Sequence, residues 1–371
     1  MRRLRMGMIG GGPGAFIGPV HRIAAELDRE IELVAGAFSS DAERSRQAGS
    51  AYRIDPDRAY PSVEALIERE RARADPIDFV TIASPNAHHL PAAALALDAG
   101  IAVLSDKPAT ATLDEARRLA GIVASSRRPY GLTYTYSGYP LVREARARIA
   151  GGALGNIRKV LVDYPQGWLA GPAEGKQAEW RVDPARAGEG GCIADIGVHA
   201  FHLAEFVTGL KVTRLLADLA AVVPGRRLDD DCQVLLRFDN GARGALLASQ
   251  IMLGERNGLR LRVYGDRGAL DWRQESPNNL LIHHADGTTE IVQAGDSSLG
   301  PDAIAASRTP GGHPEGYLEA FANLYRDFAK TLRGEPGSLV PGIADGVRGM
   351  AFIHTAVAAS RADAGWTAFE D

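Results

Sequence analysis

The chain has 371 residues, of which 45% are hydrophobic and 24% are charged, a composition that is ordinary for a soluble globular protein. This length is long for a single hydrophobic core and favours two domains. The formal net charge of −4 gives no support for a nucleic-acid partner. Cys192 and Cys232 are the only cysteines, too few for a disulfide framework or a cysteine-based zinc site, and they suit a reducing cytoplasm. We expect a cytoplasmic protein with no membrane-spanning segment.

The N-terminal segment allows two interpretations. Arginines at positions 2, 3 and 5 precede an apolar run from Met6 to Val20, which resembles a signal peptide. The run also contains glycines at positions 10, 11, 12, 14 and 18, which are dense enough to break a signal helix. The same residues fit a strand that enters a phosphate-binding turn, and we favour this second interpretation.

The first third of the chain alternates strand and helix patterns. Short apolar runs predict strands over residues 4–9, 31–38, 77–84, 101–104 and 130–134. Helices are predicted between them, over residues 19–27, 41–48, 90–99 and 113–125. Strands separated by helices of this length indicate βαβ units and a parallel sheet.

The pattern changes near Tyr139. A strand is predicted over 157–164 and a helix over 195–207, and hairpin patterns follow at 232–250, 259–264 and 280–293. Residues 295–316 are predicted to form a long loop, before amphipathic helices over 317–332 and 347–362. The sequence thus predicts an α/β protein with a Rossmann domain over 1–138 and an α/β domain with a large, mostly antiparallel sheet over 139–371. The terminal helices could pack back on the first domain.

A glycine-rich turn follows the first predicted strand and contains the pattern G-x-G-x-x-A. Glycine lets the backbone turn tightly and approach a pyrophosphate, whose charge then faces the N–H groups of the next helix. A second frame, beginning at Gly12, fits equally well, and the spacing alone does not select the phosphate contacts. The candidate cofactor-binding residues of this turn are Gly10, Gly12, Gly14, Ala15, Phe16 and Ile17.

The end of the second predicted strand lacks the acidic residue that usually binds the adenine ribose. Ser39 and Ser40 stand there, with Arg44 nearby, and this combination can accept the 2′-phosphate of NADP. Alternatively, one of the serines only caps the next helix. We expect NAD as the cofactor and keep NADP as the alternative, with Ser39, Ser40 and Arg44 as candidate contacts.

Two further stretches carry candidate catalytic residues. Lys107 follows a predicted strand, and Asp195 and His199 lie four residues apart. If a helix begins at Asp195, the two side chains share one face, and the carboxylate can orient the imidazole and stabilise its protonated form. Such an imidazole can act as the general base for a secondary alcohol, while a lysine hydrogen-bonds the reacting oxygen.

Four motifs in order along the chain resemble those of the Gfo/Idh/MocA family: the glycine turn, Ser84–His89, Asp106-Lys107-Pro108 and Gly190–His199. The resemblance implies a Rossmann domain, a C-terminal α/β domain, a site in the cleft between them and catalytic roles for Lys107, Asp195 and His199. It also implies that Ser84, Asn86, His89 and Lys107 contribute to the cofactor site.

Within this family, the stretches Tyr164–Trp168, Gln177–Arg181 and Gly312–Tyr317 resemble the branch that contains levoglucosan dehydrogenase. This resemblance implies oxidation, with NAD, of the C3 hydroxyl of an anhydrosugar or related glycoside. An aromatic wall with a few polar groups suits a hydroxyl-rich ring, although Trp168 and Tyr136 could be core aromatics and Arg181 could bridge structural carboxylates. The candidate substrate residues are Lys107, Tyr136, Gln166, Trp168, Arg181, Asp195 and His199.

The function that the sequence predicts is therefore an NAD(P)-dependent oxidation of a ring hydroxyl of a sugar, anhydrosugar, glycoside or inositol. Two rivals stay open: a redox-silent hydrolase or lyase with a recycled, bound NAD, and a non-catalytic nicotinamide-binding sensor. We expect a homo-oligomer of two or four copies, no nucleic-acid or membrane partner, and no metal, since no His, Cys, Asp or Glu spacing indicates a metal site.

Overall fold

The structure is a computed structural model that describes residues 2–12 and 14–371, except for the side chains of Lys176 and Gln177. The chain forms two compact units. Unit 1 contains Met1–Thr133, Gly175–Trp180 and Phe321–Val347, and unit 2 contains Tyr134–Glu174, Arg181–Ala320 and Arg348–Asp371. Each unit combines three separate stretches of the chain, whereas the sequence prediction divides the chain at a single point, residue 138.

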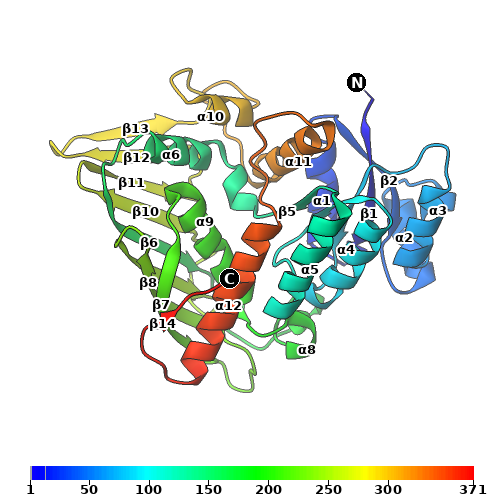
Figure 1. The fold of residues 1–371 in the computed structure, drawn as a ribbon, viewed down its shortest axis with the longest axis horizontal. Coiled ribbons are helices and arrows are strands. Elements are labelled where there is room, and N and C mark those ends of the chain that lie inside the picture. The colour runs from blue at the N-terminus through cyan, green and yellow to red at the C-terminus, as the bar shows by residue number, and fades with distance from the viewer. Residues whose placement is uncertain (1, 13) are drawn as a thin grey trace. The chain divides into compact units, whose positions relative to one another are not determined.

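Unit 1 is built on a five-stranded parallel sheet with the strand order β2-β1-β3-β4-β5 (Figure 1). Its strands are β1 (Leu4–Gly10), β2 (Ile31–Ala37), β3 (Phe79–Ala83), β4 (Ala102–Ser105) and β5 (Tyr130–Leu132). Every position of β3 and β4 is buried, as expected for parallel strands between layers of helices. The predicted parallel sheet is confirmed, and the run from Met6 to Val20 forms a strand, a turn and the start of a helix.

The helices of the first third are α1 (Ile17–Glu26), α2 (Ala42–Ala51), α3 (Val63–Arg71), α4 (His89–Asp98) and α5 (Leu113–Ser126), with 3₁₀ turns η1 (Pro56–Arg58) and η2 (Asn86–His88). Four of these helices match the prediction within a few residues. Helix α3 is absent from the prediction because its charged sequence, VEALIERER, buries only Leu66, Ile67 and Glu70. Most of α11 (Tyr317–Arg333) and the start of α12 (Ile343–Arg361) also belong to unit 1.

The strand order of unit 1 reverses at β1, which pairs with β2 on one side and with β3 on the other. In open parallel sheets, ligands bind beyond the carboxyl ends of the strands at such a reversal. Three of the predicted motifs follow the ends of β1, β3 and β4. The topology therefore places the glycine turn, Ser84 and Lys107 along one edge of the sheet.

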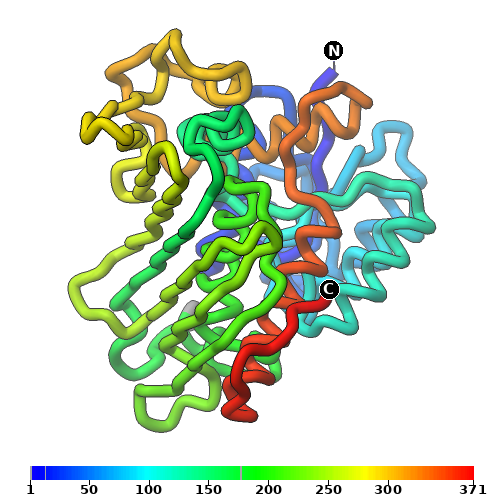
Figure 2. The backbone as a smooth tube through the Cα atoms, turned by 60° about the vertical axis from the view of Figure 1, so that its left-hand side comes forward, coloured from blue at the N-terminus to red at the C-terminus, as the bar shows by residue number. Residues whose placement is uncertain are grey.

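Unit 2 contains a nine-stranded sheet with the order β13-β12-β11-β10-β6-β9-β8-β7-β14. Only β6 and β9 pair in parallel, so the predicted, mostly antiparallel sheet is confirmed. Figure 2 shows its long strands side by side. The strands are β6 (Ile157–Pro165), β7 (Val212–Ala220), β8 (Asp231–Phe238), β9 (Arg243–Ser249), β10 (Arg260–Gly265), β11 (Gly268–Arg273), β12 (Asn279–His284), β13 (Thr289–Gln293) and β14 (Thr367–Ala368).

Helices α6 (Pro140–Ala150) and α9 (Val198–Thr208) pack on one face of this sheet (Figure 1). Helix α9 is buried over nearly its whole length, which explains its largely apolar sequence. The remaining helical segments are η3 (Thr135–Gly138), α7 (Lys176–Arg181), α8 (Pro184–Ala187), η4 (Ile193–Gly197) and α10 (Pro301–Ala306). Among the described residues, every helix is too short or too polar to cross a membrane.

Two predictions about unit 2 are wrong in detail. The predicted loop over 295–316 contains α10, which starts at Pro301, a residue that suits the first turn of a helix because it needs no N–H partner there. The helix predicted to begin at Asp195 begins earlier, as the π-helical turn η4, and continues as α9 from Val198. Asp195 thus lies in a wider turn than the α-helix that the prediction assumes.

Candidate functional site

The glycine turn after β1 requires glycine at several positions. Gly10, Gly11 and Gly14 have φ angles of +82°, +71° and +78°, a region that side-chain-bearing residues rarely adopt. A Cβ atom on Gly10 would lie 2.7 Å from the carbonyl oxygen of Ala83 at the end of β3. The Gly11 N–H donates to the same oxygen at 3.1 Å. The turn is therefore held against the carboxyl end of β3.

Helix α1 begins directly after this turn and fits a pyrophosphate. Its N-cap residue, Phe16, is 62% exposed and makes no capping hydrogen bond with its side chain. Gly14 is exposed, and Gly12, Ala15 and Ile17 are half-buried. Because the first N–H groups of a helix carry a partial positive charge and have no partner within the helix, this end of α1 suits a phosphate.

The residues after β2 correct one interpretation. Asp41, and not Ser39 or Ser40, caps helix α2: its carboxylate accepts a hydrogen bond from the Arg44 N–H at 2.8 Å. The Ser39 hydroxyl accepts from the Asp41 N–H at 3.2 Å. The side chains of Ser40 and Arg44 are exposed. The capping alternative for the serines is therefore wrong, and the exposed groups are available to a ligand.

The motif after β3 is tied to the motif after β4 through His89. Its ring nitrogens lie 2.8 Å from the carbonyl oxygens of Ser84 and Pro108. The ring is buried, and burial lowers the pKa of His89, while the two carbonyls and Asp106 act in the opposite direction. Asn86 lies in η2 and is also buried. His89 thus connects the residue that follows β3, Ser84, to the residue that follows Lys107, Pro108.

Lys107 follows β4 and is half-buried. Its backbone N–H donates to the Asp106 carboxylate at 2.9 Å, and the same oxygen accepts from the Thr133 hydroxyl at 2.9 Å. The peptide bond between Lys107 and Pro108 is cis. Asp106 therefore holds the backbone at Lys107 rather than standing free at the edge of the sheet.

Asp195 receives two hydrogen bonds within unit 2. Its Oδ2 atom accepts from the Arg181 Nε–H at 2.9 Å and from the Gln250 amide at 2.9 Å. The side chain of Asp195 is 16% exposed and that of Arg181 is 21% exposed. Two converging donors, one of them cationic, favour the ionised form of this carboxylate. Arg181 therefore contacts a candidate catalytic group.

His199 lies in the first turn of α9 among tyrosine rings. Its ring centroid is 4.9 Å from that of Tyr136, 5.9 Å from that of Tyr134 and 6.5 Å from that of Tyr164, each in an edge-on arrangement. Burial raises the pKa of Tyr136 and Tyr164, and the charge of Asp195 raises both further. His202, one turn further on, stacks on Tyr134 at 4.0 Å and is buried.

A network of polar side chains continues from these tyrosines. Tyr136 and Tyr164 are hydrogen-bonded through their hydroxyls, and the Asn257 Oδ1 atom accepts from Tyr164 and from Gln166, each at 2.8 Å. The Trp168 indole donates to Gln166 at 2.8 Å. Trp168 is 47% exposed and is not a core aromatic, whereas Tyr136 is buried. The Arg181 guanidinium lies 5.7 Å from the centroid of the Trp168 ring.

Unit 2 thus brings together all six of its predicted substrate residues, while Lys107 and the cofactor residues belong to unit 1. Sequence reasoning missed Gln250 and Asn257 as members of this site. Gln250 is the last residue of a predicted strand, a place where functional residues are common, but its partner is 55 residues away. Asn257 lies in a loop whose sequence carries no signal for the contact.

One group of possible metal ligands is found among the described residues, contrary to what the spacing indicates. A ligand atom from each of Cys192, Asp229 and Cys232 lies within 4.8 Å of the others. The oxygens of Asp229 accept from the Gly191 and Ile193 N–H groups, both at 2.7 Å, and from Cys232 at 3.0 Å. Burial raises the pKa of both cysteines. These bonds describe a carboxylate that holds the chain before η4, with thiols as neighbours.

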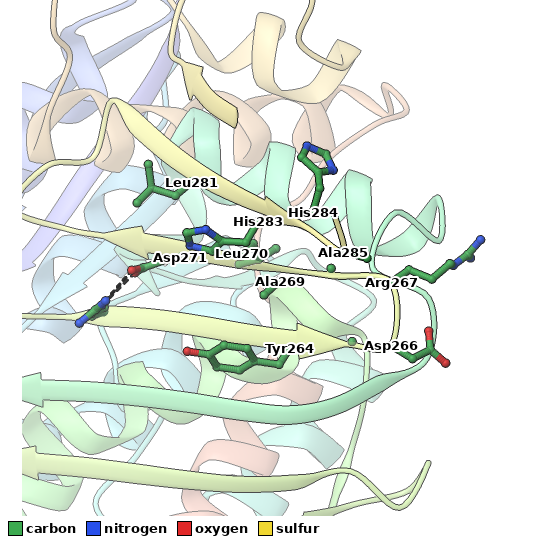
Figure 3. Close-up of a pocket in the computed structure, with 13 residues that line it drawn as sticks. Tyr264, Asp266, Arg267, Ala269, Leu270, Asp271, Leu281, His283, His284 and Ala285 are labelled. Atoms are coloured by element: carbon green, nitrogen blue, oxygen red, sulfur yellow. Dashed lines mark hydrogen bonds and ion pairs between the residues drawn. The ribbon is translucent and has the colours of Figure 1, made fainter. Parts of the chain in front are cut away.

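The surface also has an open hollow over β10–β12, which Figure 3 shows. It is lined by residues such as Tyr264, Arg267 and His283, and an ion pair joins Arg260 to Asp271 beside it. None of the predicted site residues lines this hollow. His283 and His284 lie on β12, where His283 is half-buried and His284 is exposed. The candidate functional residues are therefore those around Asp195 in unit 2 and those at the carboxyl edge of the sheet in unit 1.

Comparisons with known families match most of the chain. The family model for oxidoreductases with an NAD-binding Rossmann fold matches residues 4–134, and the GFO/IDH/MocA C-terminal domain matches residues 142–271. The uncharacterized oxidoreductase YfiI of Bacillus subtilis (strain 168) is 32% identical over 99% of this chain and 97% of its own length. Levoglucosan dehydrogenase of Pseudarthrobacter phenanthrenivorans is 26% identical, over 99% and 98% of the two chains.

Solved structures agree with this assignment. An inositol dehydrogenase homolog from Azotobacter vinelandii, complexed with NAD+, has a TM-score of 0.96 and 35% identity, over 99% of this chain and 98% of that one. The same homolog complexed with NADH and myo-inositol has a TM-score of 0.94 over the same shares. The chain therefore belongs to the Gfo/Idh/MocA family of oxidoreductases, with an NAD-binding Rossmann fold and the family's C-terminal domain.

Proposed function

We propose that this oxidoreductase is an NAD-dependent dehydrogenase that oxidises a secondary hydroxyl on a sugar or polyol ring to a ketone. The observation that carries the proposal is the arrangement in unit 2: Asp195 is held by two donors, and His199 lies among three tyrosines. One of the two donors, Arg181, lies over the exposed ring of Trp168. A carboxylate and an imidazole in one polar, aromatic pocket suit proton removal from a ring alcohol.

The residues divide the chemistry as follows. When bound, NAD would supply the acceptor for the hydride of the carbinol carbon. His199 takes the hydroxyl proton as general base, and Asp195 orients the imidazole and stabilises its cation. Lys107 hydrogen-bonds the oxygen as it becomes a carbonyl. The alcohol thereby loses a hydride and a proton, and the products are the ketone, NADH and a proton released to water.

The substrate class follows from the relatives and from the exposed aromatic side chain. A homolog with 35% identity binds myo-inositol, and a relative with 26% identity acts on levoglucosan. Both ligands are rings that carry several hydroxyls. Trp168 offers an exposed face for such a ring, and Gln166 and Arg181 offer polar groups beside it. We propose a cyclic polyol or anhydrosugar as substrate, with the C3 hydroxyl as the position of attack in a sugar.

The decisive experiment measures NADH production at its absorbance band with myo-inositol, levoglucosan and simple glycosides. We expect stoichiometric NADH with at least one ring substrate. The redox-silent hydrolase or lyase predicts product without net NADH, and a nicotinamide-binding sensor predicts NADH binding without product. Absence of turnover across the panel, with intact NADH binding, would favour the sensor.

Lys107→Met tests the lysine's role. We expect it to abolish turnover while NADH affinity, measured by fluorescence titration, stays within a few-fold of the wild type. The reason is that the ammonium acts on the reacting oxygen, whereas the turn and α1 hold the cofactor. Turnover near the wild-type level would remove Lys107 from the mechanism.

We propose NAD rather than NADP as the preferred cofactor. Homolog complexes contain NAD+ or NADH, and the loop after β2 carries Asp41, whose carboxylate caps α2. Ser40 and the exposed Arg44 are the groups that could instead accept a 2′-phosphate. Comparison of kcat/KM for the two cofactors with one substrate checks this, and a higher value with NADP would assign Ser40 and Arg44 to a phosphate pocket.

The predicted cytoplasmic location and the homo-oligomer of two or four copies stay predictions. Analytical ultracentrifugation of the purified chain measures the second directly, and a single species with the mass of one chain would contradict it.

A further inference from the structure

Gln250 is a residue of unit 2 that neither the motifs nor the spacing indicated. It follows β9 directly and is 3% exposed. Its backbone is fixed on both sides: the N–H donates to the Asp230 carbonyl at 2.9 Å, and the carbonyl accepts from the Leu169 N–H at 3.1 Å. A long side chain on so constrained a backbone can hold a partner with little loss of conformational entropy.

The partner that Gln250 holds is the carboxylate of Asp195. The amide Nε2 atom lies 2.9 Å from Asp195 Oδ2, the same oxygen to which Arg181 donates. Two donors on one oxygen fix the carboxylate's direction. They differ in charge: Arg181 is a cation that partly neutralises Asp195, whereas the amide adds a hydrogen bond without a charge.

We propose that Gln250 is a positioning residue for the reaction, which fixes the ionised carboxylate of Asp195 beside His199 so that it can stabilise the imidazolium. The inference rests on the proposed function and adds to it a residue that acts through Asp195. A neutral donor suits this role because a second cation would cancel the charge that the imidazolium needs, and a second carboxylate would compete with Asp195 for protons.

Other ionisable groups also face the Asp195–His199 pair and set the background for any change in pH dependence. Among the described residues these include Arg181 of α7, Tyr136 of η3, Tyr164 of β6, and Tyr134 and Cys192, which precede η3 and η4. None of these residues is altered by a substitution at Gln250, so a shift in the pH profile reports on the amide itself.

Two variants separate hydrogen bonding from charge. Gln250→Leu keeps a side chain of similar size and removes the donor, and we expect kcat to fall by about tenfold because Asp195 loses a charge-assisted bond. Gln250→Glu places a carboxyl group against Asp195. The added negative charge raises the affinity of His199 for its proton, so the pH at which the oxidation rate rises should move upward.

Gln233→Glu is the matched control, since Gln233 is exposed on β8 and the substitution changes the net charge by the same amount. It should leave both kcat and the pH profile unchanged. The measurements are kcat–pH profiles with one ring substrate, NADH affinity, and an NMR titration of the His199 ring in the cofactor-free protein. NADH affinity should stay within a few-fold in all variants.

A wild-type kcat and pH profile in both Gln250 variants would overturn the inference. An equal loss of NADH affinity and kcat in both would also overturn it, because that result indicates general damage to the fold. If the wild type oxidises no ring alcohol, the proposed function fails first. In that case the NMR titration still decides whether Gln250→Glu raises the pKa of His199. The inference requires this rise, because residue 250 contacts Asp195.

Discussion

At the scale of single residues, the proposed base, His199, depends on the proposed partner carboxylate of Asp195. His199 is 9% exposed and lies among three tyrosine rings, surroundings that disfavour a charged imidazolium unless an anion compensates. We propose that Asp195 supplies that anion, and the hydrogen bonds from Arg181 and Gln250 favour the ionised form of its carboxylate. The imidazole and the carboxylate therefore form one functional unit, and their ionisations are expected to be shared.

A double-mutant cycle tests this unit. We expect His199→Ala to lower kcat by roughly 10²–10⁴-fold, the range for a positioned general base, and Asp195→Asn to lower it as well. The fold-decrease in kcat of the double variant should be far smaller than the product of the fold-decreases of the two single variants. The experiment is a kcat–pH profile for the wild type and the three variants. If the profile of His199→Ala matches the wild type, Lys107 becomes the better candidate for the base.

The site residues that the sequence predicts are those that motifs carry. Lys107, Asp195 and His199 stand in short patterns whose neighbours identify them. Gln250 and Asn257 act through side chains that are distant in sequence, and a lone amide in a strand or loop has no pattern of its own. The physical reason is that their roles come from tertiary contacts, which arise only when β6, β9 and the loop before β10 come together.

At the scale of elements, regular strand and helix alternation was predictable and local irregularity was not. The buried strands of unit 1 have continuous apolar runs, and the hairpin of β8 and β9 turns at Asn240-Gly241, where Gly241 has a φ of +87°. Strands β7 and β11 escaped prediction. The π-helical turn η4 escaped because its sequence has a helical pattern, while its geometry depends on Asp229, more than thirty residues away.

A substitution at Asp229 tests whether the geometry of η4 depends on this carboxylate. Its carboxylate accepts two backbone N–H groups just before η4, and its own carbonyl accepts from the Cys192 N–H at 2.8 Å. In Asp229→Asn, one acceptor becomes an N–H₂ group that faces a backbone donor. We expect the start of η4 to shift and kcat to fall at least about tenfold, since a hydrogen bond to a charged group contributes about 2 kcal/mol.

Asp230→Asn is the control for this prediction. Asp230 is 1% exposed, and its side chain accepts from the N–H groups of Val222 and Val223 and pairs with Arg226. Replacing the Asp230 carboxylate by an amide should lower the melting temperature, because it breaks the buried ion pair with Arg226. The kcat of the folded variant should stay close to that of the wild type. Equal kcat values for the two variants would show that Asp229 has no special relation to the site.

At the scale of the whole molecule, unit 1 is assembled from segments that are distant in sequence. His21 of α1 has Nδ1 2.7 Å from the hydroxyl of Tyr325 in α11, and that hydroxyl lies 3.0 Å from Thr81 of β3. The His21 ring also packs edge-on against Phe321, at 4.8 Å between centroids. A C-terminal helix is thereby fixed to the first helix and to the central sheet of the same unit.

This junction makes the stability of unit 1 sensitive to acid. Burial lowers the pKa of His21 to about 4, an effect that Asp106 opposes and His89 reinforces. In the unfolded chain the pKa is the ordinary 6.5. Below pH 6.5 the unfolded chain binds a proton that the folded chain does not accept until about pH 4. The contribution of the neutral, buried His21 to the free energy of unfolding is therefore intact above pH 6.5. It is lost as the pH falls toward 4, by roughly 3 kcal/mol in total.

Denaturant unfolding between pH 8 and pH 5 measures this loss. Between pH 6.5 and pH 5 the free energy of unfolding of the wild type should fall by about 2 kcal/mol more than that of His21→Gln, which has no titrating ring at this position. His313→Gln, at an exposed position, should behave like the wild type. Parallel pH dependences of the wild type and His21→Gln would mean that His21 is protonated in the folded protein. The contact between α1 and α11 would then have to tolerate an imidazolium, with Asp106 at 4.0 Å as its counter-ion.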